Sequence, residues 1–471
     1  MTKTSAINRI HELLDDNSFV EVGAYITARS TDYNMQSQET PADGVVTGYG
    51  TINGALVYVY SQDASVMGGS IGEMHAKKIE KLYSMAMKMG APIVALVDCA
   101  GFRLQESMDA LDGFGKLYVC QAMASGVIPQ IQAVFGNCGG GMAVASEMAD
   151  FTFMEQEAKM FVNAPFVIAE NDADNSSAEY QAKETGNVCG TGSEEEILGQ
   201  IRQLIGLLPS NFEDNDSFVE CTDDLNRTCD DITACAGDTS IALSMISDDS
   251  FYMEMKKDYA PEMVTAFIRL NGATVGCVAN RSEVYNAEGE KAETFDNVLS
   301  VRGCKKAADF VKFCDAFELP VLTLTNVKGY KATKCSEANI AKAAASLTYA
   351  FANATVPKVN VVVGEAFGSA YLTMNSKSTG ADMVFAWPES QIGMMDAKLA
   401  AKIMYADSDA ATINEKAAEY AQLQSSALSA AKRGYVDTII EPEDTRKYVI
   451  GAFEMLFTKR ENRPSKKHGT V

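Results

Sequence analysis

The residues best suited to chemistry are three consecutive glycines, Gly139, Gly140 and Gly141, which follow an apolar segment at residues 127–135. A short apolar run after a proline is typical of a parallel strand covered on both faces. Glycines at its end allow a sharp turn and let a ligand approach the backbone. The next residues open a helix whose first N–H groups face the turn. The pattern indicates a site that holds an oxyanion with backbone donors, and a tight turn without a ligand is the alternative.

The composition is that of an acidic globular protein. The chain has 471 residues, enough for two or three domains, with 47% hydrophobic and 22% charged residues. Its 63 acidic and 40 basic side chains give a net charge of -23. Nucleic acid is therefore not expected as a partner, since phosphates are met by clustered lysine and arginine. An anionic ligand would have to be held by local basic groups and backbone amides.

Metal-binding motifs and targeting segments are not evident. The eleven cysteines form no Cys-x-x-Cys pair, which argues against a zinc ribbon. With only three histidines, of which His75 is interpreted as structural, we expect neither a metal site nor a His-dependent triad. The first residues lack the apolar core of a signal peptide, and no apolar stretch reaches the ~20 residues needed to span a bilayer. We therefore expect a cytoplasmic protein, or one peripheral to a membrane complex.

The elements that must position the glycine turn follow one another in a regular order. Asn53-Gly54 is a strong signal for a hairpin turn between two strands. A helix, a buried strand and a second helix then lead to the strand before the glycines. The expected elements are strands at 44–50 and 55–60, a helix at 71–89, a strand at 93–97 and a helix at 112–124.

The second half of the chain repeats this order. The segment Ile52–Val57 recurs loosely at 270–275, and the strand after Pro92 recurs after Pro320. Pro92 and Pro129 are 37 positions apart, and so are Pro320 and Pro357. Five such matches in the same order indicate two copies of one α/β domain.

The duplication predicts domains at residues 1–240 and 241–471, with the polar, flexible-looking segment 209–238 at the boundary. Each copy supplies two turns of small residues after its strands, and such turns bind ligands in open α/β sheets. Together they could direct two N–H groups at one oxyanion, whereas close packing of helices on strands is the structural alternative. The four turns are Cys99–Phe102, Gly139–Gly141, Val327–Tyr330 and Gly368–Ala370.

Motifs along nearly the whole chain resemble the carboxyltransferase subunits of biotin-dependent acyl-CoA carboxylases, such as propionyl-CoA carboxylase β subunits, and the related α subunits of sodium-pumping acyl-CoA decarboxylases. The resemblance implies two tandem crotonase-like βαβ-superhelix domains and a homohexamer. The motifs that carry it include residues 43–54, 60–63, 68–75, 103–106, 124–130, 313–317, 354–358 and 386–388, together with the glycine turn.

The resemblance also implies a reaction. A carboxyl group would move between carboxybiotin on a carrier protein and the α-carbon of a short-chain acyl-CoA, such as propionyl-CoA or methylmalonyl-CoA. Biotin would thus be the cofactor, and the partners would be a biotin carboxyl carrier protein with a biotin carboxylase or a membrane decarboxylase subunit. Gly140 and Gly141 would supply one oxyanion hole, and Ser369 and Ala370 the other.

Substrate-binding residues follow from the same resemblance. Gly329, with its neighbours Val327 and Tyr330, falls in the segment that binds the acyl-CoA in the family. Arg103 is expected to pin the shape of its turn or to order a ligand, because a guanidinium forms several fixed hydrogen bonds. The other expected binding residues are Ala100, Gly101, Phe102, Gly368 and Tyr371.

Departures from the family pattern cluster in the second half. Ser369 adds a side chain where the family has glycine, Asp396 adds a carboxylate, and Lys331 replaces a leucine. An altered acyl pocket is therefore expected. Three alternatives remain: a decarboxylase α subunit, a non-catalytic assembly subunit, and a biotin-independent crotonase-type enzyme that uses Glu106 or Asp396 as its catalytic acid.

Overall fold

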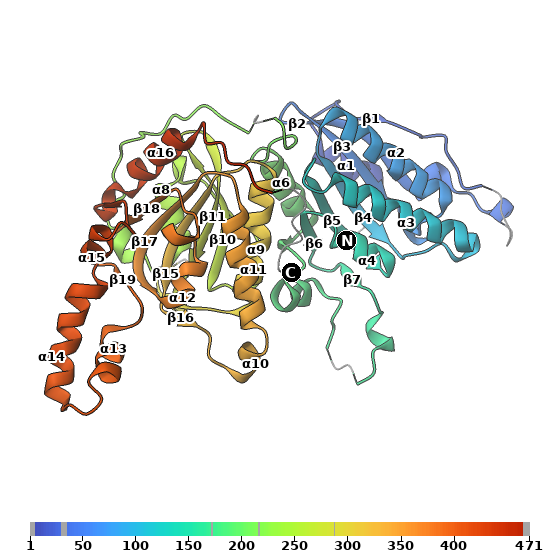
Figure 1. Ribbon diagram of the computed structural model, residues 1–471. Helices are drawn as coiled ribbons and strands as arrows, with labels where there is room; N and C mark the ends of the chain where they lie inside the picture. Colours follow the sequence, from blue (N-terminus) through green and yellow to red (C-terminus); the bar gives the residue numbers. More distant parts are fainter. Residues whose placement is uncertain (1–4, 30–34, 171–172, 215–216, 287, 465–471) are drawn as a thin grey trace. The chain divides into compact units, whose positions relative to one another are not determined.

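The chain folds into two compact units, Met1–Ser217 and Phe218–Val471. The computed structural model describes residues 5–29, 35–170, 173–214, 217–286 and 288–464 (Figure 1). Each unit is built on one sheet of eight strands within this described part of the chain. The two units share their strand order and helix placement, and each is described separately below.

The sheet of the first unit has the order β1-β2-β3-β4-β5-β6-β8, and β7 pairs with β5 beyond the end of β6. β2 and β3 form the expected antiparallel hairpin, and the strands from β3 onward are parallel. The strands are β1 (Val20–Glu21), β2 (Val45–Ile52), β3 (Ala55–Gln62), β4 (Ile93–Cys99), β5 (Gln130–Gly139), β6 (Phe151–Glu155), β7 (Lys159–Phe161) and β8 (Gly190–Gly192).

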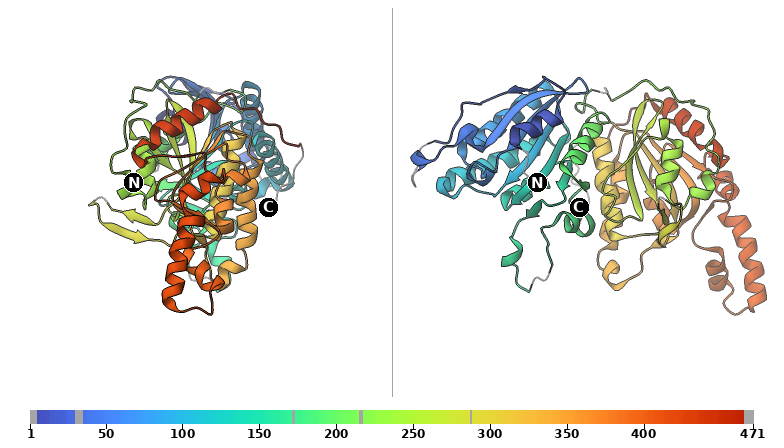
Figure 2. Two further views of the ribbon diagram at one scale, coloured as in Figure 1. Left: turned by 60° about the vertical axis from the view of Figure 1, so that its left-hand side comes forward. Right: turned by 180° about the vertical axis from the view of Figure 1, so that it is seen from behind.

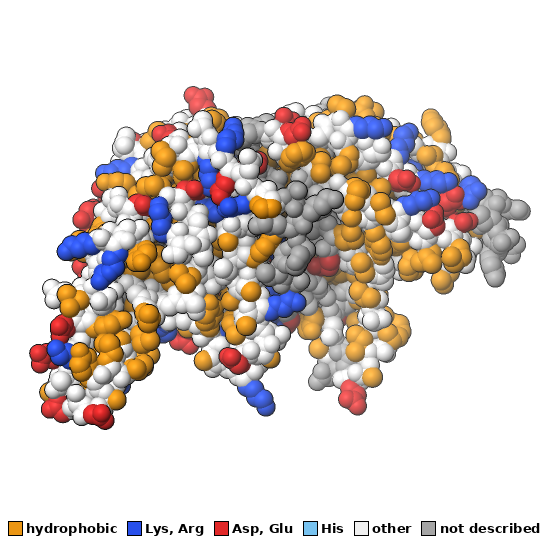
Figure 3. Space-filling model, viewed as in Figure 1, with side chains coloured by type: hydrophobic (Ala, Val, Ile, Leu, Met, Phe, Trp, Pro, Cys, Tyr) orange, Lys and Arg blue, Asp and Glu red, His pale blue; other side chains and the backbone are white. Residues whose placement is uncertain are grey.

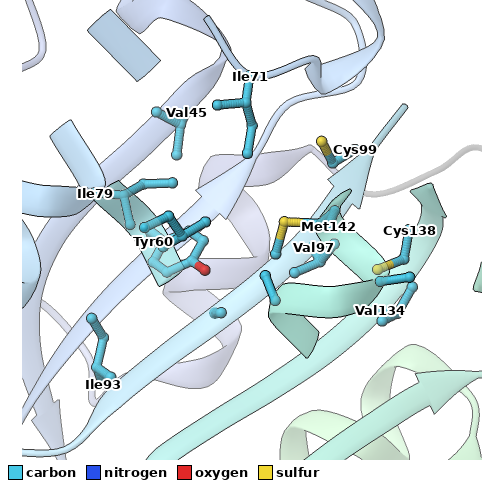
Figure 4. Close-up of a cluster of buried hydrophobic side chains, with 14 of the residues drawn as sticks. Val45, Tyr60, Ile71, Ile79, Ile93, Val97, Cys99, Val134, Cys138 and Met142 are labelled. Atoms are coloured by element: carbon cyan, nitrogen blue, oxygen red, sulfur yellow. The ribbon is translucent and has the colours of Figure 1, made fainter. Parts of the chain in front are cut away.

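Helices cover both faces of this sheet. Helices α2 (Glu73–Met89) and α3 (Ser107–Ala124) pack side by side against the face that carries Ile93, Ala95 and Val97. Helices α1 (Ala6–Leu13) and α6 (Glu194–Ile205) contact each other and the strands on the opposite face. Figure 4 shows the buried cluster on the α2–α3 face, which continues below the glycine turn. Burial on both faces explains why β4 and β5 are apolar without alternation.

The sheet of the second unit has the matching order β20-β18-β17-β15-β11-β10-β9, and β19 pairs with β17. β10 and β11 form the hairpin, and the remaining strands from β11 are parallel. The strands are β9 (Tyr252–Glu254), β10 (Met263–Leu270), β11 (Ala273–Asn280), β15 (Val321–Val327), β17 (Lys358–Phe367), β18 (Met383–Ala386), β19 (Gln391–Gly393) and β20 (Thr438–Ile439).

The helices of the second unit repeat those of the first. Helices α9 (Val301–Ala316) and α11 (Ile340–Asn353) pack together on one face. Helices α8 (Thr239–Ile246) and α16 (Thr445–Leu456) bury apolar side chains in the core on the other face. Short strands β14 (Val298–Leu299) and β16 (Gly329–Tyr330) form a separate parallel pair.

The two units meet in sequence earlier than the predicted boundary at 240/241. Cys229 and Ile232, within the segment expected to be a flexible linker, are buried in the core of the second unit. Helix α7 (Ile232–Cys235) also contacts α8. Apolar side chains spaced among the acidic residues therefore anchor this segment to the second unit.

Two parts of the second unit project from its sheet. Hairpin β12 (Glu283–Tyr285) and β13 (Lys291–Thr294) stands away from the strands (Figure 2). Helices α13 (Ala397–Met404) and α14 (Ala410–Tyr420) form a helical hairpin with apolar side chains gathered on its surface (Figure 3). Leu399, Ile403 and Met404 are among these exposed apolar residues.

Candidate active site

The glycine turn of the first unit lies between β5 and the short helix α4 (Gly141–Ser146). Gly140 has φ 58° and ψ −121°, the conformation of the first central residue in a type II′ turn. A Cβ placed on Gly140 would meet no atom within 4 Å, so the backbone conformation rather than crowding requires glycine there. The open space beside Gly140 is room in which a ligand could lie.

The N–H groups around this turn are not equally available. The Gly140 N–H donates to the carbonyl of Phe161 at 2.9 Å, and the Ala100 N–H donates to Gly68 at 3.0 Å. The Gly101 N–H contacts the sulfur of Cys99 at 3.3 Å. For Gly141 and the next residue, Met142, we find no acceptor of the N–H within the described residues. The free donors of the turn are thus one position later than the expected pair, because β7 uses the Gly140 amide.

A bulge between β4 and β5 sets the turn's position. The register shifts between Val97 and Cys99, so that β5 carries two extra residues. The carboxylate of Asp98 accepts the N–H of Asn137 at 3.0 Å and fills the space where a Cβ on Gly136 would lie. Gly136 is therefore required for the close approach of Asp98 to the neighbouring strand.

The second unit repeats the bulge. The register of β15 and β17 shifts between Thr325 and Val327. The side-chain oxygen of Asn326 accepts the N–H of Glu365 at 3.0 Å, and it would lie 2.6 Å from a Cβ on Gly364. The same backbone solution thus appears twice, with a carboxylate in one copy and an amide in the other.

The turn of the second unit lies between β17 and helix α12 (Gly368–Thr373). Gly368 has φ 60° and lies 11 residues after Pro357, just as Gly140 lies 11 residues after Pro129. Ser369 and Ala370 follow, and their N–H groups have no acceptor in the part of the chain that the structure describes. The repeat therefore aligns Gly141 and Met142 with Ser369 and Ala370.

A cavity of about 350 Å³ opens at this second turn. It brings together five of the expected site residues, which are Gly329, Tyr330, Gly368, Ser369 and Ala370. Sequence reasoning missed other lining residues, whose positions on β17 and α13 have no motif of their own. These are Glu365, Phe367 and Leu399.

Two expected binding residues of the second unit do not line this cavity. Val327 is fully buried in β15, and Tyr371 is only 7% exposed in α12. Burial raises the pKa of Tyr371 to about 12, so its hydroxyl stays protonated. Val327 pairs with Ala366 of β17, and Tyr371 belongs to the helix that follows the turn, so both are buried next to it.

The turn at Cys99–Phe102 in the first unit combines an exposed ring with a buried charge. Phe102 is 40% exposed, and the centroid of its ring lies 4.5 Å from that of the Phe114 ring. Arg103 is fully buried; it forms ion pairs with Asp43 at 2.5 Å and Glu106 at 2.8 Å. The guanidinium therefore fixes the turn from within, and its burial leaves no surface for a ligand.

The two carboxylates considered as catalytic acids are already engaged. Glu106 is buried, pairs with Arg103 and accepts the N–H of Glu73 at 2.6 Å. Asp396 lines the cavity, but its carboxylate accepts the N–H of Leu399 at 2.9 Å and so caps helix α13. Each carboxylate therefore has a structural role.

Other titratable groups near α2 also have structural roles. His75 is fully buried, and burial lowers its pKa to about 3, so the imidazole is neutral. Lys78 is buried and donates to the carbonyls of Ala42 and Val45, with burial lowering its pKa to about 8. Over the residues that the structure describes, no group of His, Cys, Asp and Glu could hold a metal ion, and no helix is long and apolar enough to cross a membrane.

The carboxyl transferase domain family matches residues 1–471, and the chain belongs to this family. It is 38% identical over 488 residues to the methylmalonyl-CoA decarboxylase subunit alpha of Veillonella parvula, covering 100% of this chain and 93% of that protein. It is likewise 38% identical over 487 residues to the propionyl-CoA carboxylase beta chain of Roseobacter denitrificans, covering 100% and 94%. The resemblance seen in the motifs is confirmed.

A solved structure confirms the fold. The transcarboxylase 12S subunit, crystallised as a hexamer with hydrolyzed methylmalonyl-coenzyme A bound, superposes with a TM-score of 0.93 at 37% identity. The match covers 99% of this chain and 92% of that one. The chain is therefore a carboxyltransferase with two tandem crotonase-like domains.

Proposed function

We propose that this carboxyltransferase moves a carboxyl group between biotin on a carrier protein and the α-carbon of a short-chain acyl-CoA. The observation that carries the proposal is the duplicated turn. Each copy presents two successive N–H groups without an acceptor among the described residues, at Gly141 and Met142 and at Ser369 and Ala370. Two turns suit a reaction in which two oxygens gain negative charge.

The chain's contribution is electrostatic. Biotin on the partner would supply the carboxyl carrier, and the N–H groups of Gly141 and Met142 would lie where its ureido oxygen could accept them. The thioester oxygen gains charge when the α-carbon of the acyl group becomes an enolate. Fixed N–H groups at each turn would stabilise one of these oxygens, and a single donor of this kind typically contributes ~10²–10³ in rate. No side-chain acid is required for this role.

The residues present fit both reactants. No atom lies within 4 Å of a Cβ placed on Gly140, which leaves room for a ureido ring beside the turn. The cavity at the second turn has room for a short acyl chain and its thioester, between Tyr330 and the side chains of Met394 and Met395. Gly140 and Gly368 would shape the turns, and the N–H groups that follow each of them would be the donors.

The proposed partners come from the relatives. We infer a biotinylated carrier, together with either a biotin carboxylase or a membrane decarboxylase subunit, because both kinds of relative are 38% identical to the chain. We also infer a homohexamer, since the similar transcarboxylase 12S assembles as a hexamer, and we propose a cytoplasmic location for it. Carboxylation and decarboxylation would use the same site in opposite directions.

Two of the alternatives have less support. A biotin-independent crotonase-type reaction would need a free carboxylate, whereas Glu106 and Asp396 are engaged by Arg103 and by the N–H of Leu399. A non-catalytic subunit would be expected to have lost its second pocket, but that cavity has a volume of about 350 Å³. Both observations favour an active transferase.

The test is carboxyl transfer by the purified protein. Methylmalonyl-CoA and free biotin should yield propionyl-CoA, and a streptavidin blot of the native complex should reveal a biotinylated partner. If no propionyl-CoA forms, malonyl-CoA is also inactive and no biotinylated partner is found, the proposal is contradicted.

A second test addresses the turn itself. Gly141→Pro removes one N–H, while Gly141→Ala adds the same Cβ and keeps the N–H. We expect kcat of the proline variant to lie ~10²–10³ below that of the alanine variant. Equal activity of the two folded variants, with the alanine variant close to the wild type, would show that this N–H is not a catalytic donor.

A further inference from the structure

A tyrosine from helix α3 holds the peptide that carries one of the proposed donors. The hydroxyl of Tyr118 donates to the carbonyl oxygen of Gly141 at 2.8 Å. That carbonyl and the N–H of Met142 belong to the same planar amide, so anchoring the oxygen fixes the direction of the N–H. Donation to the carbonyl also polarises the amide and strengthens its N–H as a donor.

The surroundings are built to admit this hydroxyl. A Cβ on Gly141 would lie 2.9 Å from the Tyr118 oxygen and 3.1 Å from the ring of Phe114. Glycine at 141 leaves room for the tyrosine's close approach, and an alanine there would require the hydroxyl to shift by a few tenths of an ångström. The Tyr118 ring packs edge-on against Phe114, with centroids 6.1 Å apart, which restricts where its hydroxyl can point.

In the second unit, the equivalent carbonyl is that of Ser369, and a tyrosine is linked to it through one further side chain. The hydroxyl of Thr373 donates to the carbonyl of Ser369 at 3.1 Å. The hydroxyl of Tyr330 lies 3.1 Å from that of Thr373. Because the Thr373 hydroxyl has a single hydrogen, its bond to Ser369 leaves the oxygen to accept from Tyr330, and also from the hydroxyl of Thr348 at 3.1 Å. The carbonyl of Ser369 shares its amide with the N–H of Ala370.

We propose that in each unit a tyrosine hydroxyl positions the second N–H of the oxyanion hole, directly through Tyr118 and by way of Thr373 through Tyr330. This inference rests on the proposed carboxyltransferase function. Tyr118, Tyr330 and Thr373 are positioning residues, since each acts through a backbone amide. Because Tyr330 also lines the cavity, an acyl group seated there would contact the same chain of hydrogen bonds that orients Ala370.

The first experiment is Tyr118→Phe, which removes one oxygen and keeps the ring. We expect kcat for methylmalonyl-CoA with free biotin to fall about tenfold, less than for a lost donor, since the N–H remains but is no longer held. KM, the calorimetric affinity for propionyl-CoA and the melting temperature should stay within error. Hydrogen exchange of the peptide containing α4 should quicken. Tyr25→Phe, at a fully exposed ring, is the matched control.

The second experiment separates hydroxyl from shape in the other unit. Thr373→Val should lower kcat about tenfold, and Thr373→Ser, which keeps the hydroxyl, should restore it. Unchanged kcat in Tyr118→Phe and Thr373→Val would overturn the proposal, and so would a loss confined to melting temperature. An inactive wild-type protein would instead contradict the proposed function, and the exchange of the α4 peptide would still report on Tyr118.

Discussion

The two turns share a backbone but differ in their side chains. Gly140 and Gly368 have φ values of 58° and 60°, and in each unit a polar side chain fills the space over a bulge glycine. Around them, the first copy has Ala100, Asn137 and Gly141, where the second has Lys328, Glu365 and Ser369. The geometry that aims N–H groups has been kept, whereas the side chains that would meet a ligand have diverged. This division is expected if both turns serve the proposed chemistry with two different ligands.

The largest effect should come from Ser369→Pro, compared with Ser369→Ala, which tests whether the second turn works like the first. Proline is tolerated in the first turn of a helix, and the Ser369 N–H has no acceptor among the described residues. If the second turn works like the first, kcat of the proline variant should lie ~10²–10³ below that of the alanine variant. Full activity would mean that only the first turn is an oxyanion hole.

The bulge glycines test whether the two scaffolds are equally tight. In Gly136→Ala, the new methyl group would overlap the carboxylate of Asp98. We expect the free energy of unfolding to fall by about 3 kcal/mol. In Gly364→Ala, the methyl group would lie 2.6 Å from the Asn326 amide. We expect the free energy of unfolding to fall by about 1–2 kcal/mol.

Thermal unfolding monitored by circular dichroism would rank these variants. Gly115→Ala is the control, because its Cβ would meet no atom within 4 Å and alanine favours a helix. A reversed order for the two bulge variants would show that the second scaffold is the more closely packed one.

The spacing of the repeat predicted much of this scaffold. Prolines 37 positions apart in both halves imply equal registers, and Ile93 pairs with Gln130 as Val321 pairs with Lys358. The hairpin was also predictable, because strand periodicity and the Asn53-Gly54 turn signal are both local patterns in the sequence.

The identity of the donors could not be predicted in this way. The Gly140 amide is taken by Phe161 through β7, a contact that depends on where the chain returns after β6. Tyr118 has no motif, because its role depends on a single hydrogen bond to Gly141. Backbone patterns are thus readable from local sequence, whereas hydrogen-bond partners across elements require the folded chain.

Two aspartates at matching positions of the two units allow the pH dependence of their stability to be compared. Asp150 accepts the N–H of Gln130 at 2.8 Å, and Asp382 accepts that of Lys358 at 2.8 Å. Burial raises the pKa of Asp150 to about 7. A raised pKa in the folded state stabilises the fold at low pH, and this contribution is lost as pH rises from about 4 to about 7.

Asp150→Asn should therefore flatten the fall in melting temperature across pH 4–7 relative to the wild type. Asp382→Asn, at the equivalent aspartate, where Lys459 lies 2.8 Å from the carboxylate, is the matched variant for the general effect of an amide at this position. Parallel profiles for the wild type and Asp150→Asn would contradict the assignment.

The smallest effects should come from the diverged side chains of the second turn. Lys328 and Glu365 line the same cavity with opposite charges, and CoA esters are anionic. We expect Lys328→Gln to raise KM for the CoA ester, and Glu365→Gln to lower it, by up to ~5-fold at low salt with kcat unchanged. Both shifts should shrink at high ionic strength, since exposed charges are screened. Shifts in the same direction would mean that the cavity does not face the CoA phosphates, and the second turn would then hold the uncharged biotin instead.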